Sequence, residues 1–134
     1  LLPLAWSADD ARELTRTDTR VRADAWVAAN VPRGDPIAAD PSTLPLPGRD
    51  VVRLELPGPG RRSDPERDLA RLRRQGVKWV ILSGAVTDRV LAAPDTYPRE
   101  ASFYAQLGHT LEPAFSVFPD EPGLAGPWVR VYRL

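Results

Sequence analysis

The chain has 134 residues, with 18 basic and 18 acidic side chains and therefore no formal net charge at pH 7. That length suits one domain with its own hydrophobic core, and the balanced charge argues against nucleic acid as a partner. Cysteine is absent, which excludes disulfides, thiolate-bound metals and a cysteine nucleophile. The single histidine, His109, cannot form a multi-histidine metal site, so we expect no metal and no cofactor.

Residues 1–16 form an amino-terminal stub that begins with the apolar segment Leu1–Trp6. Six apolar residues are far fewer than the roughly 20 that cross a bilayer as a helix, and nothing predicts a signal peptide. Two interpretations stay open. The segment packs on its own domain, or it is the end of a membrane helix with Trp6 at the interface. We expect residues 17–134 to form a single α/β domain.

The first predicted helix begins at Asp18 or Thr19, both good N-cap residues, and ends near Asn30. Pro32 restricts the residue before it and so stops the helix there. Apolar residues at helical spacing predict the buried face. They are Val21, Ala25, Ala28 and Ala29, flanked by Trp26 and Val27.

Two short strands are predicted next, at residues 36–40 and 51–56. Three prolines and a glycine in residues 41–50 make the connection between them irregular. Residues 51–56 alternate between apolar and polar side chains after Val51, as in an edge strand with one solvated face.

A capping-box pattern predicts that the second helix begins around Ser63. Ser63 caps the helix, Glu66 bonds back to it, and Pro65 lies in the first turn, where no amide is needed. Leu69 and Leu72 form its buried stripe, and Gly76 ends the helix.

Residues 77–83 are the longest nearly continuous apolar run, held between Gly76 and Gly84. From Trp79 onward both alternating faces are apolar, which is typical of a strand with helices on both sides of its sheet. We therefore predict that this strand is the centre of the sheet.

A helical turn around residues 87–91 and a helix from Pro98 to Gly108 are predicted to follow. Residues 111–118 and 128–134 then alternate as two strands of an antiparallel hairpin. The predicted fold is a small three-layer α/β sandwich with a mostly parallel central sheet and this carboxyl-terminal antiparallel hairpin. Right-handed crossovers place the two earlier strands on one side of the central strand and the hairpin on the other.

Arg61, Arg62 and Ser63 are candidates for binding an anion. They precede a predicted helix N-terminus, where free amides favour an anion and two arginines can grip a phosphate. The alternative is a solvated turn before a capped helix, because the sequence matches neither a phosphate-binding loop nor a dinucleotide fingerprint.

Asp40 and Ser83 follow two predicted strands, at the edge where ligands bind in open α/β sheets. Because no glycine-rich first turn accompanies them, we expect capping and turn roles for both. His109, after Gly108, is expected to bond the last carbonyls of its helix. No nucleophile elbow is present, and we predict no catalytic residue in this chain.

Four segments of the second half carry a resemblance to a known family. They are Gly-Val-Lys-Trp-Val-Ile-Leu-Ser at 76–83, Phe-Tyr-Ala-Gln-Leu at 103–107, Phe-Ser-Val-Phe-Pro at 115–119 and Gly-Pro-Trp-Val-Arg-Val-Tyr-Arg-Leu at 126–134. Together with residues 18–34, they resemble the carboxyl-terminal extracytoplasmic domain of bacterial polytopic glycosyltransferases. These are the GT-C, or dolichyl-phosphate-mannose protein mannosyltransferase-like, membrane enzymes.

The resemblance implies that Leu1–Trp6 ends the last membrane helix and that the domain lies on the extracytoplasmic face of the bacterial cytoplasmic membrane. Its partner would be the membrane-embedded part of the same polypeptide. Family members transfer a sugar from a polyprenyl-phosphate donor with an acidic residue near their first membrane helices, a region outside this sequence. The implied role of the domain is to cover the active site, to recognise the lipid-linked sugar or the acceptor, or to stabilise the enzyme. An independent module that binds a phosphorylated small ligand near Arg61 and Arg62 is the alternative.

Overall fold

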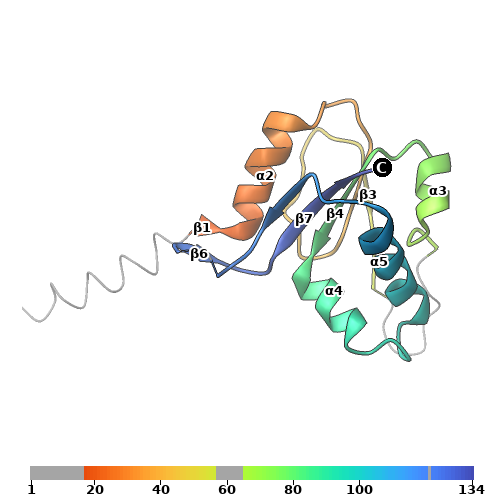
Figure 1. The fold of residues 1–134 in the computed structure, drawn as a ribbon. Coiled ribbons are helices and arrows are strands. Elements are labelled where there is room, and N and C mark those ends of the chain that lie inside the picture. The colour runs from red at the N-terminus through yellow and green to blue at the C-terminus, as the bar shows by residue number, and fades with distance from the viewer. Residues whose placement is uncertain (1–16, 57–64, 121) are drawn as a thin grey trace, which may run out of the picture.

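The computed structural model describes residues 17–56, 65–120 and 122–134 (Figure 1). In this part of the chain, five strands form one mixed sheet in the order β3-β2-β4-β7-β5. A separate two-stranded parallel pair is formed by β1 (Thr17–Asp18) and β6 (Leu124–Ala125). None of the helices in the described ranges has the length and apolar composition needed to span a membrane.

The sheet is organised around β4 (Trp79–Ser83), all five residues of which are buried. On one side, β2 (Ile37–Ala39) and β3 (Val51–Arg53) run parallel to it. On the other side, β7 (Val129–Arg133) is antiparallel to β4, and β5 (Phe115–Val117) is antiparallel to β7. The central position of β4, the hairpin and the two sides of the sheet are as predicted. Within the five-stranded sheet two strand pairs are parallel and two are antiparallel, so the prediction of a mostly parallel sheet is not confirmed.

One face of the sheet packs against α2 (Thr19–Asn30), and the boundaries predicted for this helix are confirmed. The carboxylate of Asp18 accepts a hydrogen bond from the Arg20 amide and caps the helix. The predicted buried face is wrong, because Ala23 and Val27 are buried whereas Val21 is 50% exposed. The other alanines predicted to be buried are also exposed: Ala25, Ala28 and Ala29.

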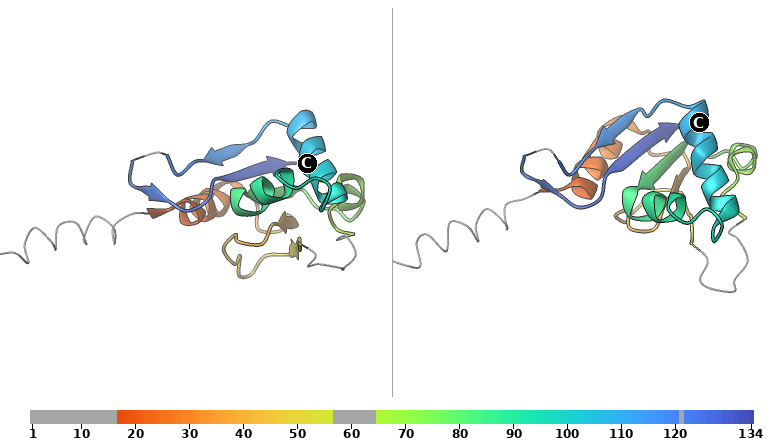
Figure 2. Two further views of the ribbon diagram at one scale, coloured as in Figure 1. Left: turned by 90° about the horizontal axis from the view of Figure 1, so that it is seen from below. Right: turned by 60° about the horizontal axis from the view of Figure 1, so that its bottom comes forward.

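The opposite face packs against α3 (Leu69–Arg74), α4 (Gly84–Leu91) and α5 (Pro98–Thr110). Figure 2 shows α4 and α5 next to each other on this side of the sheet, in agreement with their mutual contacts. Each helix contributes buried apolar side chains to one core. They are Leu69 and Leu72 on α3, Val86 and Val90 on α4, and Phe103 and Leu107 on α5.

Two predicted helix boundaries are wrong. α3 begins at Leu69 and not near Ser63, because the Asp68 carboxylate accepts a 3.1 Å hydrogen bond from the Arg71 amide and supplies a later N-cap. Pro65 and Glu66 therefore precede the helix, and Ser63 lies outside the described residues. α5 continues through Gly108 to Thr110, because Gly108 can adopt helical backbone like any other residue.

Candidate functional site

A buried polar cluster lies where β2 and β4 end. Asp40 directly follows β2, and its side chain is fully buried. Its Oδ1 accepts a 2.6 Å hydrogen bond from the Tyr104 hydroxyl of α5 and a 3.1 Å hydrogen bond from Nη2 of Arg67, which precedes α3. Its Oδ2 accepts a 3.3 Å hydrogen bond from the Ser83 amide. One carboxylate thus joins both strands to the helical layer.

The side chain of Arg67 is held by the same cluster. Its guanidinium is fully buried, and its Nε donates a 3.2 Å hydrogen bond to the Tyr104 hydroxyl. The guanidinium carbon also lies 5.7 Å from the centre of the Tyr104 ring, a cation–π distance. A buried ion pair needs such additional hydrogen bonds to offset the loss of hydration. Arg67 therefore has a fixed position beside Asp40.

Burial governs the electrostatics of this cluster. It raises the pKa of Asp40 from 3.8 to about 6, because the loss of hydration outweighs the opposing effects of Tyr104, Arg67 and the Ser83 amide. The pKa of Tyr104 is also raised, first by burial and then by the charge of Asp40. Tyr104 therefore stays a neutral hydrogen-bond donor at physiological pH, whereas Asp40 changes charge within the range of mildly acidic pH.

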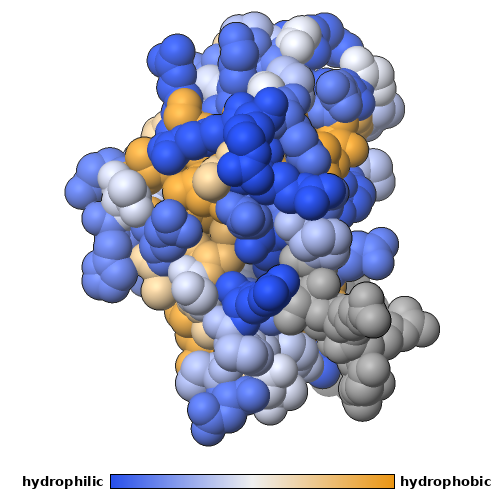
Figure 3. Space-filling view, turned by 90° about the vertical axis from the view of Figure 1, so that its right-hand side faces the viewer, coloured by the Kyte–Doolittle hydropathy of each residue, from blue (hydrophilic) through white to orange (hydrophobic). Residues whose placement is uncertain are grey.

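A cleft of about 420 Å³ lies next to the cluster, between α3 and α5. Figure 3 views this side of the molecule, where strongly hydrophilic side chains gather over the surface. Asp68 lines the cleft, and the other polar side chains among the described lining residues are four arginines and two neutral hydrogen-bonding groups. They are Arg67, Arg71, Arg74, Arg99, Ser102 and Gln106.

Helical spacing places these groups on facing surfaces. Arg71 and Arg74 lie three residues apart on α3, and Arg99 and Ser102 lie three residues apart on α5, so each pair shares one side of its helix. Arg71 forms a 3.4 Å ion pair with Glu66. Among the described residues, Arg74 and Arg99 have no carboxylate within ion-pair distance. Guanidinium groups in this state suit a phosphate or another oxyanion, which they bind through paired N–H groups.

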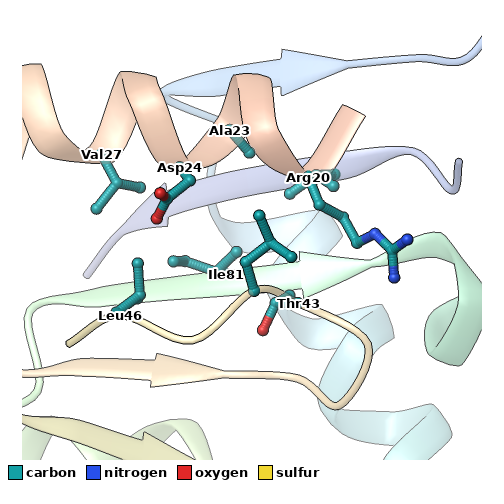
Figure 4. A pocket seen from close by; sticks show the side chains of 9 residues that line it. Arg20, Ala23, Asp24, Val27, Thr43, Leu46 and Ile81 are labelled. Carbon is teal, nitrogen blue, oxygen red and sulfur yellow. The ribbon is translucent and has the colours of Figure 1, made fainter. Parts of the chain in front are cut away.

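A second depression lies between α2 and the connection that precedes β3 (Figure 4). Val27, Leu46 and Ile81 supply apolar contacts, while Arg20 and Asp24 stand at its edge. Its volume is only about 10 Å³, which is close to the space of one water molecule. The depression is therefore a packing gap at the edge of the core and offers no room for a ligand.

The structure places the predicted site residues in different settings. Arg61, Arg62 and Ser63 lie outside the described residues. The capping role of Ser83 is confirmed, because its hydroxyl accepts a 3.3 Å hydrogen bond from the Ala85 amide at the start of α4. The turn role predicted for Asp40 is incomplete, because its side chain bonds to three residues distant in the chain, Arg67, Ser83 and Tyr104, instead of to its own loop.

His109 is exposed within α5, so the prediction that it follows the end of the helix is wrong. The four arginines of the cleft were not predicted from the sequence. Three-residue spacing on α3 was the one available signal, but a solvated helix face produces the same pattern. In the described ranges no group of three or more acidic or histidine side chains is placed to hold a metal ion.

No protein-family profile, curated protein or solved structure matches this chain.

Proposed function

We propose that this chain is a non-catalytic recognition domain of a polytopic glycosyltransferase that uses a polyprenyl-phosphate sugar donor. In this proposal the α3/α5 cleft binds the phosphate group of the donor. Residues 17–134 form a three-layer α/β domain on the extracytoplasmic face of the membrane, and the membrane-embedded part of the same polypeptide is its partner. The resemblance of segments such as 76–83 and 126–134 supports the enzyme class, and the chemistry of the cleft supports the ligand.

The observation that carries the ligand is the convergence of arginines on one cleft. Arg74 and Arg99 come from different helices, line the same cleft and lack an ion-pair partner in the described ranges. A phosphate group with one or two negative charges can bond to both guanidinium groups at once. Ser102 and Gln106 line the same cleft and can bond to hydroxyl groups of a sugar attached to that phosphate.

The proposal also accounts for the buried cluster behind the cleft. Asp40 and Tyr104 fix the arginine that precedes α3, and Tyr104 lies on α5. The same hydrogen bonds therefore fix the two helices relative to each other, which keeps the cleft open without a ligand. A preformed site loses less conformational entropy on binding than a site that must first assemble.

The test compares vesicles of neutral phosphatidylcholine that carry a short-chain polyprenyl phosphate with vesicles that carry the neutral polyprenol. We expect the chain to co-sediment with the phosphate-bearing vesicles only. The double variant Arg74→Gln/Arg99→Gln should bind them at least about tenfold more weakly, because charge-assisted hydrogen bonds contribute about 1.5 to 3 kcal/mol each. Arg73→Gln/Arg89→Gln is the matched control, since it removes the same charge from exposed positions outside the cleft.

Equal binding to polyprenol vesicles, or an equal loss in both double variants, would contradict a specific phosphate site. The second candidate function is an independent module for a soluble phosphorylated ligand, and the same cleft favours it. Tight binding of a sugar phosphate with no preference for the lipid would support that function. A coding sequence without a membrane-spanning helix on the amino-terminal side of Leu1 would contradict the membrane context.

A further inference from the structure

We infer that Asp40 controls the anion affinity of the α3/α5 cleft by taking up or releasing a proton. A proton on its carboxylate removes one negative charge next to Arg67 and thereby makes the electrostatic potential in the cleft more positive. The inference rests on the proposed function, because it concerns the regulation of the same site. Anions should therefore bind more tightly at mildly acidic pH than at neutral pH.

The inference depends on the position of Arg67, which belongs both to the lining of the cleft and to the buried cluster around Asp40. This residue lines the cleft, yet its guanidinium is fully buried and bonded to Asp40 and Tyr104. It therefore acts on a ligand through its electric field and not as a direct contact. Fields that cross a poorly hydrated interior are screened less than fields between exposed charges. Whether Asp40 is charged thus affects the potential in the cleft.

A count of the charges around the cleft gives the size of the change. Among the described residues, four arginines line the cleft, and three carboxylates either line it or pair with those arginines. The carboxylates are Asp40, Glu66 and Asp68. These described groups have one net positive charge when all are ionised. A proton on Asp40 raises that net charge to two.

Three groups from different elements face the Asp40 carboxylate. Arg67 faces it from the segment before α3, Tyr104 from α5, and the Ser83 amide from β4. Arg53 of β3 bonds elsewhere, to Thr43 and Leu44. Asp88 of α4 bonds to Trp128. Burial sets the pKa of Asp40 at about 6.

A second buried carboxylate, Glu100, supplies a control. It lies one helical turn before Tyr104 on α5 and is 1% exposed. Neither of its carboxylate oxygens has a hydrogen-bond partner among the described residues. It does not line the cleft and is not bonded to any of the cleft arginines in the described ranges. Glu100→Gln therefore changes a buried acid on the same helix without changing the pair of Asp40 and Arg67.

The experiment is calorimetric titration with sulfate, an oxyanion that keeps the same charge from about pH 5 to about pH 8. The affinity should be about threefold to tenfold higher at about pH 5 than at about pH 7.5, the effect of one partly screened charge. Because the two binding equilibria are thermodynamically linked, bound sulfate must in turn favour the protonated form of Asp40. Titrations near pH 6 in two buffers of different ionisation enthalpy should therefore show net proton uptake on binding.

Two variants and two control variants assign the proton to Asp40. Asp40→Asn should bind sulfate with an affinity that does not depend on pH, and without proton uptake. Tyr104→Phe removes a hydrogen bond that lowers the pKa of Asp40, so the midpoint of the affinity change should move to higher pH. Glu100→Gln and His109→Gln should keep both the pH dependence and the proton uptake of the unaltered chain.

The outcomes separate this inference from the proposed function. Sulfate binding without pH dependence, or proton uptake that persists in Asp40→Asn, would overturn the role of Asp40 and leave the anion site intact. If Asp40→Asn does not fold, an unchanged midpoint in Tyr104→Phe would overturn it equally. The absence of sulfate binding at every pH would contradict the anion site itself and, with it, the proposed function.

Discussion

Replacing Tyr104 with phenylalanine should destabilise the fold without leaving a cavity, because only one oxygen is removed. That oxygen donates a 2.6 Å hydrogen bond to Asp40 and accepts a 3.2 Å hydrogen bond from Arg67. Both partners are charged at neutral pH, and hydrogen bonds to charged groups contribute about 1.5 to 3 kcal/mol each. Asp40 keeps its bonds to Arg67 and to the Ser83 amide. We therefore expect the free energy of unfolding to fall by about 3 kcal/mol at pH 7.

Tyr104→Phe should lower the free energy of unfolding by a smaller amount at acidic pH. Below the pKa of about 6, Asp40 carries a proton, and the bond from Tyr104 then ends on a neutral acid. A neutral hydrogen bond contributes about 1 kcal/mol, so the loss at about pH 4.5 should shrink to about 2 kcal/mol. The difference between the two pH values is the specific signature of the pair.

Urea denaturation at the two pH values measures these losses, with an unchanged slope as evidence that the unfolding transition is the same. Tyr132→Phe is the matched control, because Tyr132 is buried and its hydroxyl has no hydrogen bond within the described ranges. The control should change stability by less than about 0.5 kcal/mol. A loss in Tyr104→Phe no larger than that of the control, or the same loss at both pH values, would refute the reasoning.

Four further stability predictions concern individual residues. A Cβ atom on Gly84 would lie 2.5 Å from the Trp128 ring, so Gly84→Ala should lower stability by about 1 to 3 kcal/mol in urea titrations. Gly108→Ala meets nothing within 4 Å and should instead raise it by about 0.5 to 1 kcal/mol. A pKa of about 6 in the fold against 3.8 in the unfolded chain means that folded Asp40 binds its proton more tightly. Stability should therefore fall by about 3 kcal/mol as pH rises from about 4 to about 6, and Asp40→Asn should abolish this slope. Ser83→Ala should reduce the unfolding free energy by about 1 kcal/mol, because α4 loses its N-cap.

Local signals in the sequence were sufficient to predict the central strand and the ends of the first helix. The apolar run before Ser83 predicted β4 because a strand buried on both faces needs apolar side chains at every position. Asp18 and Pro32 predicted the ends of α2 because capping and proline chemistry act over one or two residues. Features that depend on neighbours along the chain were therefore predictable.

Features that depend on distant packing were not. The alanines of α2 are distributed around most of its circumference. The hydrophobic pattern therefore does not distinguish the buried face of Ala23 and Val27 from the exposed face of Val21. The predicted start of α3 depended on Ser63 alone, whereas Asp68 caps the helix, and the buried pair of Leu69 and Leu72 needs only the shorter helix. Tertiary packing decides both cases.

The candidate site was not predicted from the sequence, although one residue of its buried cluster, Asp40, was singled out. Asp40 was recognised as the end of a strand in an open sheet, yet its partners Arg67 and Tyr104 lie 27 and 64 residues further along the chain. No pattern in one sequence specifies such a pairing. The arginines of the cleft likewise belong to two helices whose separation depends on the packed core, so only the fold brings them together.

The most direct test of anion recognition is an NMR titration of the uniformly ¹⁵N-labelled chain with inorganic phosphate at constant ionic strength. We expect saturable shifts of the backbone amide signals of Arg71, Arg74, Arg99 and Ser102, and of the Nε–H signals of the three arginines. Signals of α2, on the opposite face of the sheet, should not move. Shifts that do not saturate, or that spread equally over all exposed arginines, would show that the cleft does not bind phosphate specifically.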